Sequence, residues 1–318
     1  GHPALQYFKL RHTPVGPGVR KKIEPQILPE SVTDCSRSAM PLTRLIIATL
    51  TLFNWHLTAT ADLQATQRLE ATWATATDLD GEVVELSAAE IPFVAIYRPQ
   101  MRDRAKGSVI LLHGRGTHAN SYPVVRPLRI GLSEQGWNTL SLQLPLVRAG
   151  ADPEAWLDNA DAITARLQAG LDWLAQRGQR NQVIVALGDS APLAMRFVAS
   201  GDPTSVRALV LISVPGELSA DADRQALAGL KRPLLDVFAE RDSDAVIGGA
   251  QARLAAAREA GSDRYVQRRI AGATLDFPGQ EAQLLAAIRA WLNANAAGTR
   301  TGAGRDKVLR YLGGIVVL

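Results

Sequence analysis

A serine near the middle of the chain lies where it could act as a nucleophile. Ser190 belongs to the segment Gly188–Pro192, which follows the apolar stretch Val183–Leu187 and precedes a helix-like stretch. A serine on a sharp strand-to-helix turn exposes its hydroxyl oxygen, and a neighbouring base can activate it for attack on an acyl carbon. The small residues of this segment favour a tight turn, and a proline is tolerated in the first turn of a helix. We therefore predict Ser190 as a candidate nucleophile.

A general base for this serine is hard to find. No histidine follows His118 in the sequence, whereas a Ser–Asp–His set in this chain order needs one near the C-terminal end of the domain. His118 lies on a loop that is expected to face the turn. It is the remaining candidate base if it comes within hydrogen-bond distance of Ser190. The sequence therefore predicts the framework of a nucleophilic site more clearly than its chemistry.

Other strand ends offer an acid and backbone donors. Asp242 follows the predicted strand Leu234–Phe238, and an acid there could orient a histidine. Acids after strands are also ordinary helix caps, and without a histidine that interpretation is favoured. His113 and Gly114 follow another apolar run, and this pair lets the backbone turn and aim an N–H at a developing oxyanion. The N–H of Ala191 is the second expected donor, and a plain glycine turn is the alternative.

Apolar strand-like runs alternate with helical stretches along the folded part of the sequence. Continuous apolar runs are typical of strands buried on both faces of a parallel sheet, and two runs at the start form a β-hairpin pattern. We therefore predict an α/β fold, with a doubly wound, mostly parallel sheet, helices on both faces and a leading β-hairpin. Val147–Trp156 is expected to be a solvated connection, with a small lid as the alternative. The strands are expected at Glu82–Leu86, Pro92–Tyr97, Ser108–Leu112, Asn138–Leu142, Val183–Leu187, Ala208–Ile212, Leu234–Phe238 and Tyr265–Ile270.

Some of these segments resemble the α/β-hydrolases, and in particular an uncharacterised bacterial domain-of-unknown-function family of exported, α/β-hydrolase-like proteins. The segments that carry the resemblance are Val109–Gly114, Leu128–Pro145, the turn at Ser190 and Gly272–Phe277. The resemblance spans residues 80–296 and implies a sheet of α/β-hydrolase type. It also implies a histidine directly before Asp276, where this chain has Leu275. Leucine cannot accept a proton, so the implied catalytic set lacks its base.

Charge is unevenly distributed along the chain. The whole chain has a net charge of +4 and a pI near 9.4. Residues 1–39 and 297–318 each carry a net charge of +3, whereas 62–296 carries about −3. Because no clustered basic face is apparent in the folded part, we predict no nucleic-acid binding. His113 and His118, without a nearby carboxylate, make a poor ligand set, so we predict neither a metal nor a cofactor.

Met40 begins a segment with the three parts of a secretory signal peptide. Arg44 supplies the positive charge, Leu45–Phe53 the apolar run and Ala59–Ala61 the small-residue cleavage pattern. The run is shorter than the roughly 20 residues that cross a bilayer, and a buried helix is the alternative. We therefore predict a periplasmic or secreted protein without a transmembrane segment in its mature form. The predicted parts are an upstream or disordered segment (1–39), a signal peptide (40–61), the α/β-hydrolase-like domain (62–296) and a flexible tail (297–318).

Two functions fit these observations. The first is hydrolysis of an ester or related acyl substrate by Ser190, with Asp242 present and the base histidine replaced by Leu275. The second is a hydrolase-like protein of the cell envelope that has lost catalysis and binds a small molecule, a lipid fragment or an envelope partner in the same pocket. The sequence makes no prediction of the oligomeric state.

Overall fold

The structure is a computed structural model of the chain, and it describes residues 64–73, 76, 79–147, 152–216 and 221–298. The predicted segments 1–39 and 40–61 lie outside the described residues, as do residues 299–318 of the predicted tail. Within the part of the chain that the structure describes, no helix is both long and apolar enough to cross a membrane.

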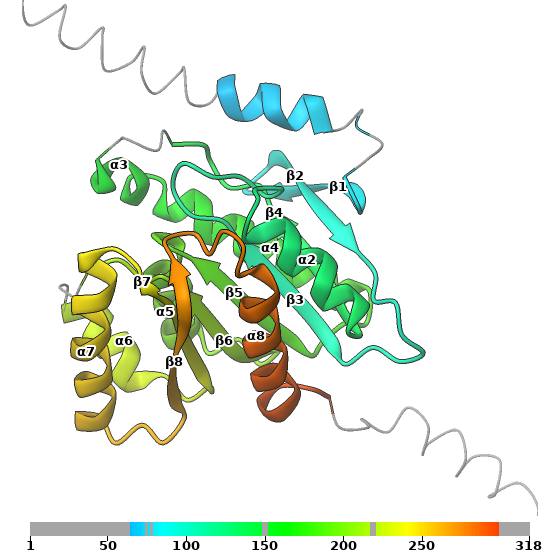
Figure 1. Cartoon of the computed structure of the whole chain (residues 1–318). Helices are drawn as coiled ribbons and strands as arrows, with labels where there is room; N and C mark the ends of the chain where they lie inside the picture. The colour runs from blue at the N-terminus through cyan, green and yellow to red at the C-terminus, as the bar shows by residue number, and fades with distance from the viewer. Residues whose placement is uncertain (1–63, 74–75, 77–78, 148–151, 217–220, 299–318) are drawn as a thin grey trace, which may run out of the picture. The chain divides into compact units, whose positions relative to one another are not determined.

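Eight strands form one sheet (Figure 1), in the order β1-β2-β4-β3-β5-β6-β7-β8. β1 pairs antiparallel with β2 and β2 antiparallel with β4, whereas all pairs from β4 to β8 are parallel. This order confirms the predicted mostly parallel α/β sheet with a leading hairpin. The strands are Glu82–Ala88 (β1), Ile91–Arg98 (β2), Gly107–Leu112 (β3), Trp137–Leu142 (β4), Gln182–Leu187 (β5), Val206–Ile212 (β6), Leu234–Arg241 (β7) and Tyr265–Thr274 (β8).

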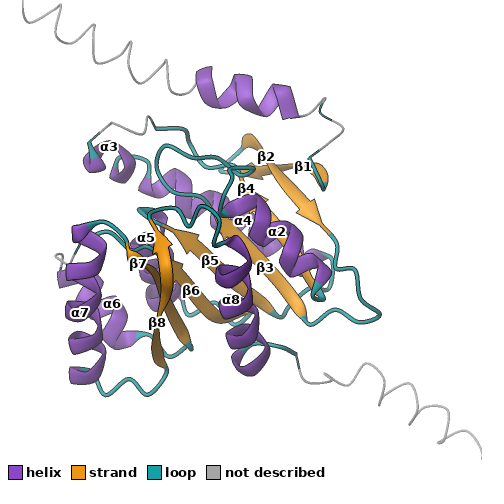
Figure 2. Cartoon of the chain, in the orientation of Figure 1, coloured by secondary structure: helices purple, strands orange, loops and turns teal. Residues whose placement is uncertain are grey.

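Helices cover both faces of this sheet (Figure 2), and each face has its own apolar core. One core contains side chains of α3, α4, α5 and α6, and the other contains side chains of α2 and α8. In β3, Ile110 and Leu112 belong to the first core, whereas Val109 and Leu111 belong to the second. Successive strand residues point to opposite faces, which explains why this strand is apolar throughout. The helices are Val125–Glu134 (α2), Pro153–Leu157 (α3), Ala160–Gln176 (α4), Ser190–Gly201 (α5), Asp221–Gly229 (α6), Asp244–Glu259 (α7) and Glu281–Asn295 (α8).

Two segments differ from the sequence prediction. β8 continues to Thr274, past the predicted end at Ile270, because after a bulge it still pairs with β7 at Arg241. Residues 153–157 form α3 where a solvated connection was expected, and Trp156 in this helix is fully buried in the first core. The prediction of a solvated connection is therefore wrong for this part.

A further helix, over residues 64–73, was not predicted. Its Trp73 is buried in a small apolar cluster with Val94 and Ile96 of β2. Glu70 forms an ion pair of 3.3 Å with Arg166 of α4. These contacts attach the helix to the hairpin side of the sheet.

Candidate functional site

The carboxyl edge of the sheet, where the parallel strands end, carries all the predicted site residues. β4 and β5 lie on opposite sides of β3, so the chain order of the sheet changes direction at β3. In doubly wound sheets, ligands bind outside the carboxyl ends of the strands at such a switch point. The loops after β3 and β5 are therefore the natural place for a site.

Gly188 occupies the turn between β5 and α5. Its φ is 56°, which lies in the left-handed region that favours glycine, and it directly follows the last residue of β5. A Cβ added to Gly188 would have only the Cα of Gly114 within 4 Å, at 4.0 Å. In a nucleophile elbow, the strained residue between strand and helix carries the exposed nucleophile. In this chain that residue has no side chain.

Ser190 lies two residues further on, as the first residue of α5. Its side chain is fully buried, and its Oγ donates a hydrogen bond of 2.5 Å to the backbone oxygen of His113. This bond joins the start of α5 to the end of β3. The buried hydroxyl therefore fastens two neighbouring elements, and it is not presented at the surface of the edge.

The two predicted oxyanion donors differ in their surroundings. The N–H of Ala191 donates to the carbonyl of Gly188 at 3.0 Å, so it closes the turn at the start of α5. Gly114 lies against the end of β5, where an added Cβ would be 3.0 Å from the carbonyl oxygen of Leu187. A side chain at position 114 would therefore push the two strand ends apart. Both residues stabilise the junction between β3 and β5.

His113 is fully buried at this junction. Its Nε2 accepts a hydrogen bond from the N–H of Leu144 at 3.0 Å, so Nδ1 carries the proton and donates to the carbonyl of Gly114 at 2.9 Å. Burial lowers the pKa of His113 to about 4. The ring is therefore neutral at pH 7, and both of its nitrogens are occupied by backbone groups.

His118, the remaining candidate base, packs against the 64–73 helix. Its ring meets that of Trp73 edge to face, with 5.3 Å between centroids, and its Nδ1 accepts from the N–H of Asn120 at 3.2 Å. Burial lowers its pKa from the ordinary value. No contact joins His118 to Ser190 among the hydrogen bonds of the described residues.

Asp242 lies after β7 and is buried. Its carboxylate accepts hydrogen bonds from Ser213 Oγ at 2.6 Å and from the N–H groups of Ala239 and Ser243, at 3.1 and 2.9 Å. These bonds hold the loops after β6 and β7 together. The N-cap of α7 is Ser243 and not Asp242, so the expectation that Asp242 caps the helix is wrong.

Leu275 lies in the loop after β8, with 53% of its surface exposed. The next residue, Asp276, is near Asp242: burial first, and then the charge of Asp242, raises the pKa of Asp276. The structure therefore brings the loop after β8, where the family resemblance implies a histidine, close to the acid after β7.

The structure thus assembles the predicted residues into two groups. His113, Gly114, Ser190 and Ala191 form the buried junction of β3 and β5, whereas Asp242 lies close to the loop of Leu275. Sequence reasoning missed Gly188 as the elbow position. The available signal was the distance from the strand, because the residue directly after a buried strand is the one that must turn.

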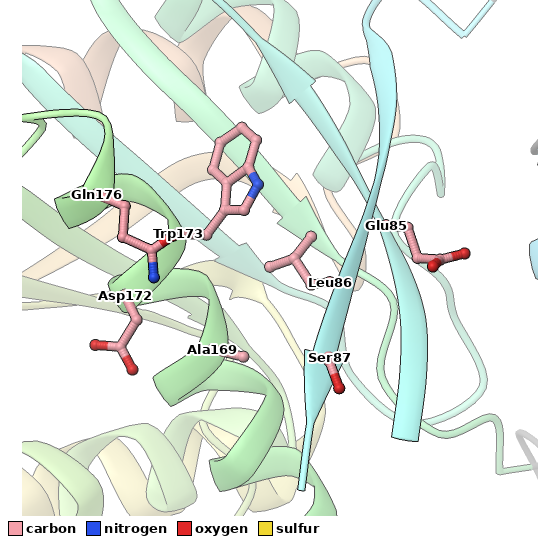
Figure 3. Close-up of a pocket in the computed structure, with 7 residues that line it drawn as sticks. All are labelled: Glu85, Leu86, Ser87, Ala169, Asp172, Trp173 and Gln176. Carbon is pink, nitrogen blue, oxygen red and sulfur yellow. The ribbon is translucent and has the colours of Figure 1, made fainter. Parts of the chain in front are cut away.

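A separate hollow of about 310 Å³ lies between β1 and α4. In Figure 3, Leu86 and Trp173 point into it, whereas Glu85 lies on the other side of β1. The guanidinium carbon of Arg177 lies over the ring of Trp173, 3.5 Å from the ring centroid. Its lining also includes the polar residues Ser87, Asp172 and Gln176. In the described part of the chain, no group of three or more His, Cys, Asp or Glu residues could hold a metal ion.

Comparisons with known proteins agree with this architecture. The model of a family described as "Protein of unknown function (DUF3530)" matches residues 57–155 and 147–294. No curated protein matches the chain.

Solved α/β-hydrolase structures share the fold at low sequence identity. The esterase domain of a Rhodothermus marinus protein is 14% identical, with a TM-score of 0.54 over 68% of this chain and 99% of that one. A lidless α/β serine hydrolase from Xanthomonas campestris is 17% identical, with a TM-score of 0.54 over 69% and 97%. An α/β serine hydrolase homologue from Coxiella burnetii is 16% identical, with a TM-score of 0.56 over 68% and 100%. These likenesses show an α/β-hydrolase fold.

Proposed function

Because this chain belongs to the family described as protein of unknown function DUF3530 and has an α/β-hydrolase fold, we propose that it binds a small apolar or lipid-like ligand at the carboxyl edge without hydrolysing it. One observation carries the proposal. The elbow residue is Gly188, which has no side chain, while the only serine of the turn is buried and bonded to a backbone carbonyl.

The surroundings of the elbow support the loss of catalysis. A serine nucleophile needs a base within hydrogen-bond distance, and position 275 provides leucine. The two histidines of the described residues are both engaged: His113 with the backbone, and His118 with Trp73 and Asn120. Neither histidine of the described residues is therefore placed to take the proton of Ser190.

Exposed apolar side chains at the same edge support ligand binding. Leu275 is 53% exposed and Tyr122, in the loop after β3, is 69% exposed. The Tyr122 hydroxyl donates to Glu281 at 2.7 Å, which links the loop after β3 to the start of α8. Gly188, where an added Cβ would have room, lies at the switch point of the sheet. Most ligand sites combine apolar walls of this kind with a few polar groups.

A fluorophosphonate probe, which reacts covalently with activated serines, tests the absence of catalysis. We expect no labelling of the folded protein at neutral pH, because the Oγ of Ser190 is buried and has no base. Mass spectrometry of the intact chain reports the adduct, and an active esterase treated in parallel controls for the probe. Stoichiometric labelling that disappears in Ser190→Ala would overturn the proposal in favour of a serine hydrolase.

Ligand binding has a separate test. With butyl butyrate as the probe, saturation-transfer NMR is expected to show contact with the protein while the ester remains intact. Leu275→Asp is expected to weaken this binding about tenfold, because it replaces an apolar contact with a charge. Ile91→Asp, at the far end of the sheet, changes an apolar residue of similar exposure (61% against 53%) and serves as the matched control. Equal weakening by both variants, or no saturation transfer, would contradict a ligand site at this edge.

A further inference from the structure

Charged side chains are sorted between the two edges of the sheet. The segments that enter the parallel strands form the amino edge, and in Figure 1 the parallel strands run from this edge toward the other. These segments are 99–106, 134–136, 177–181, 202–207, 230–233 and 258–264. They contain ten Lys or Arg and five Asp or Glu, a net charge of +5.

The carboxyl edge has the opposite charge. Its described segments are 113–124, 143–147, 152–161, 188–190, 213–216, 240–244 and 275–281. They contain two arginines and ten Asp or Glu, a net charge of −8. The near-neutral total of the domain therefore conceals a strong charge separation along the strand direction. Such a separation gives the molecule a preferred orientation toward any charged surface.

Several Lys and Arg side chains of the amino edge form no hydrogen bond or ion pair within the described part of the chain. Arg104, Arg180, Arg207 and Lys231 are exposed, and none of their side chains forms a hydrogen bond or an ion pair with another described residue. By contrast, Arg232 pairs with Asp202 at 2.8 Å. Unpaired cations keep their full attraction for an external anion, because no internal carboxylate neutralises them.

We infer that the amino edge docks onto an anionic phospholipid surface, with the acidic carboxyl edge facing away from it. The exposed apolar residues of this edge favour lipid. Met101, 61% exposed, precedes Arg102, and Val266, 39% exposed, follows Arg264 by two residues. An apolar side chain among cations suits the interface between headgroups and acyl chains.

The same edge is poorly suited to nucleic acid. Proteins that hold single strands stack bases on aromatic rings, and no aromatic side chain is among the large, exposed hydrophobic residues of the described amino edge.

Vesicle binding of the full chain tests this inference. We expect it to bind phosphatidylcholine–phosphatidylglycerol vesicles more tightly than pure phosphatidylcholine, and to lose the difference at roughly 0.5 M salt. Binding to the neutral vesicles measures any contribution from the apolar run 45–53. The triple variant Arg104→Gln/Arg180→Gln/Arg207→Gln should weaken binding to the anionic vesicles by about 100-fold, because each cation near the surface contributes several-fold.

A matched control separates edge charge from total charge. Gln225→Glu/Gln251→Glu/Gln283→Glu also lowers the net charge by three, but its positions lie on α6, α7 and α8 and away from the amino edge. It should leave vesicle binding within a few-fold of wild type. Equal weakening by both triple variants, absence of binding to anionic vesicles, or tighter binding to a duplex DNA of matched charge would each overturn the inference.

Discussion

The double variant Gly188→Ser/Leu275→His is expected to hydrolyse p-nitrophenyl acetate at least about 100-fold faster than the wild-type protein, as judged by initial rates corrected for spontaneous hydrolysis. The first substitution places a hydroxyl on the residue with φ 56°, in open space facing Gly114. The second provides a base in the loop whose next residue, Asp276, is close to Asp242. An oriented base typically contributes 10²–10⁴-fold to such a reaction.

Three control variants determine which residue occupies the nucleophile position. Leu275→His alone is expected to remain inactive, because Ser190 Oγ is bonded to the backbone of His113. Gly188→Ala/Leu275→His imposes the same backbone strain without the hydroxyl and is also expected to be inactive. Adding Ser190→Ala to the active pair should leave the rate largely unchanged. Activity in Leu275→His alone that is lost on adding Ser190→Ala would return the nucleophile position to Ser190.

Asp236→Leu is expected to lower the free energy of unfolding by about 3–5 kcal/mol, the cost of leaving a buried charge without its partner. Asp236, fully buried in β7, accepts from Arg253 Nε at 2.8 Å and from the Tyr265 hydroxyl at 2.6 Å. Burial and then the charge of Asp236 raise the pKa of Tyr265, so its hydroxyl stays protonated and donates. Urea unfolding at pH 7 measures the change.

The same ion pair positions part of the carboxyl edge. Arg253 Nη1 donates to the carbonyls of Val214 and Gly216, at 3.2 and 3.0 Å, in the loop after β6. Asp236→Leu should therefore also expose this loop to hydrogen exchange. Asp202→Asn is the control, because it breaks an ion pair of the same 2.8 Å length that is partly exposed, and it should cost less than about 1 kcal/mol. An equal loss in both variants would show that burial of the Asp236–Arg253 pair has no special effect.

The signal peptide, the export of the protein and the flexible tail stay predictions, because residues 1–63 and 299–318 lie outside the described residues.

The strands of the sheet could be predicted from the sequence alone. A parallel strand with helices on both faces is buried on both, and an unbroken apolar run such as Val183–Leu187 is typical of it. The same reasoning located the loops at the carboxyl edge, whereas the expectation of a histidine at position 275 came from the family resemblance. Element ends were less accurate: β8 extends to Thr274 because its pairing with β7 continues beyond the apolar run.

Only the tertiary structure decided which residue turns the chain at the elbow. Both Gly188 and Ser190 fit a tight turn in the sequence, but β5 remains paired with β6 up to Leu187, and the Gly188 N–H donates to Ile212 at 2.8 Å. The turn must then begin at Gly188, and Ser190 is drawn into the helix. The charge separation between the two edges of the sheet could not be predicted from the sequence either. Segments far apart in the chain enter or leave one sheet, so their charges gather at its two edges only when the strands pair.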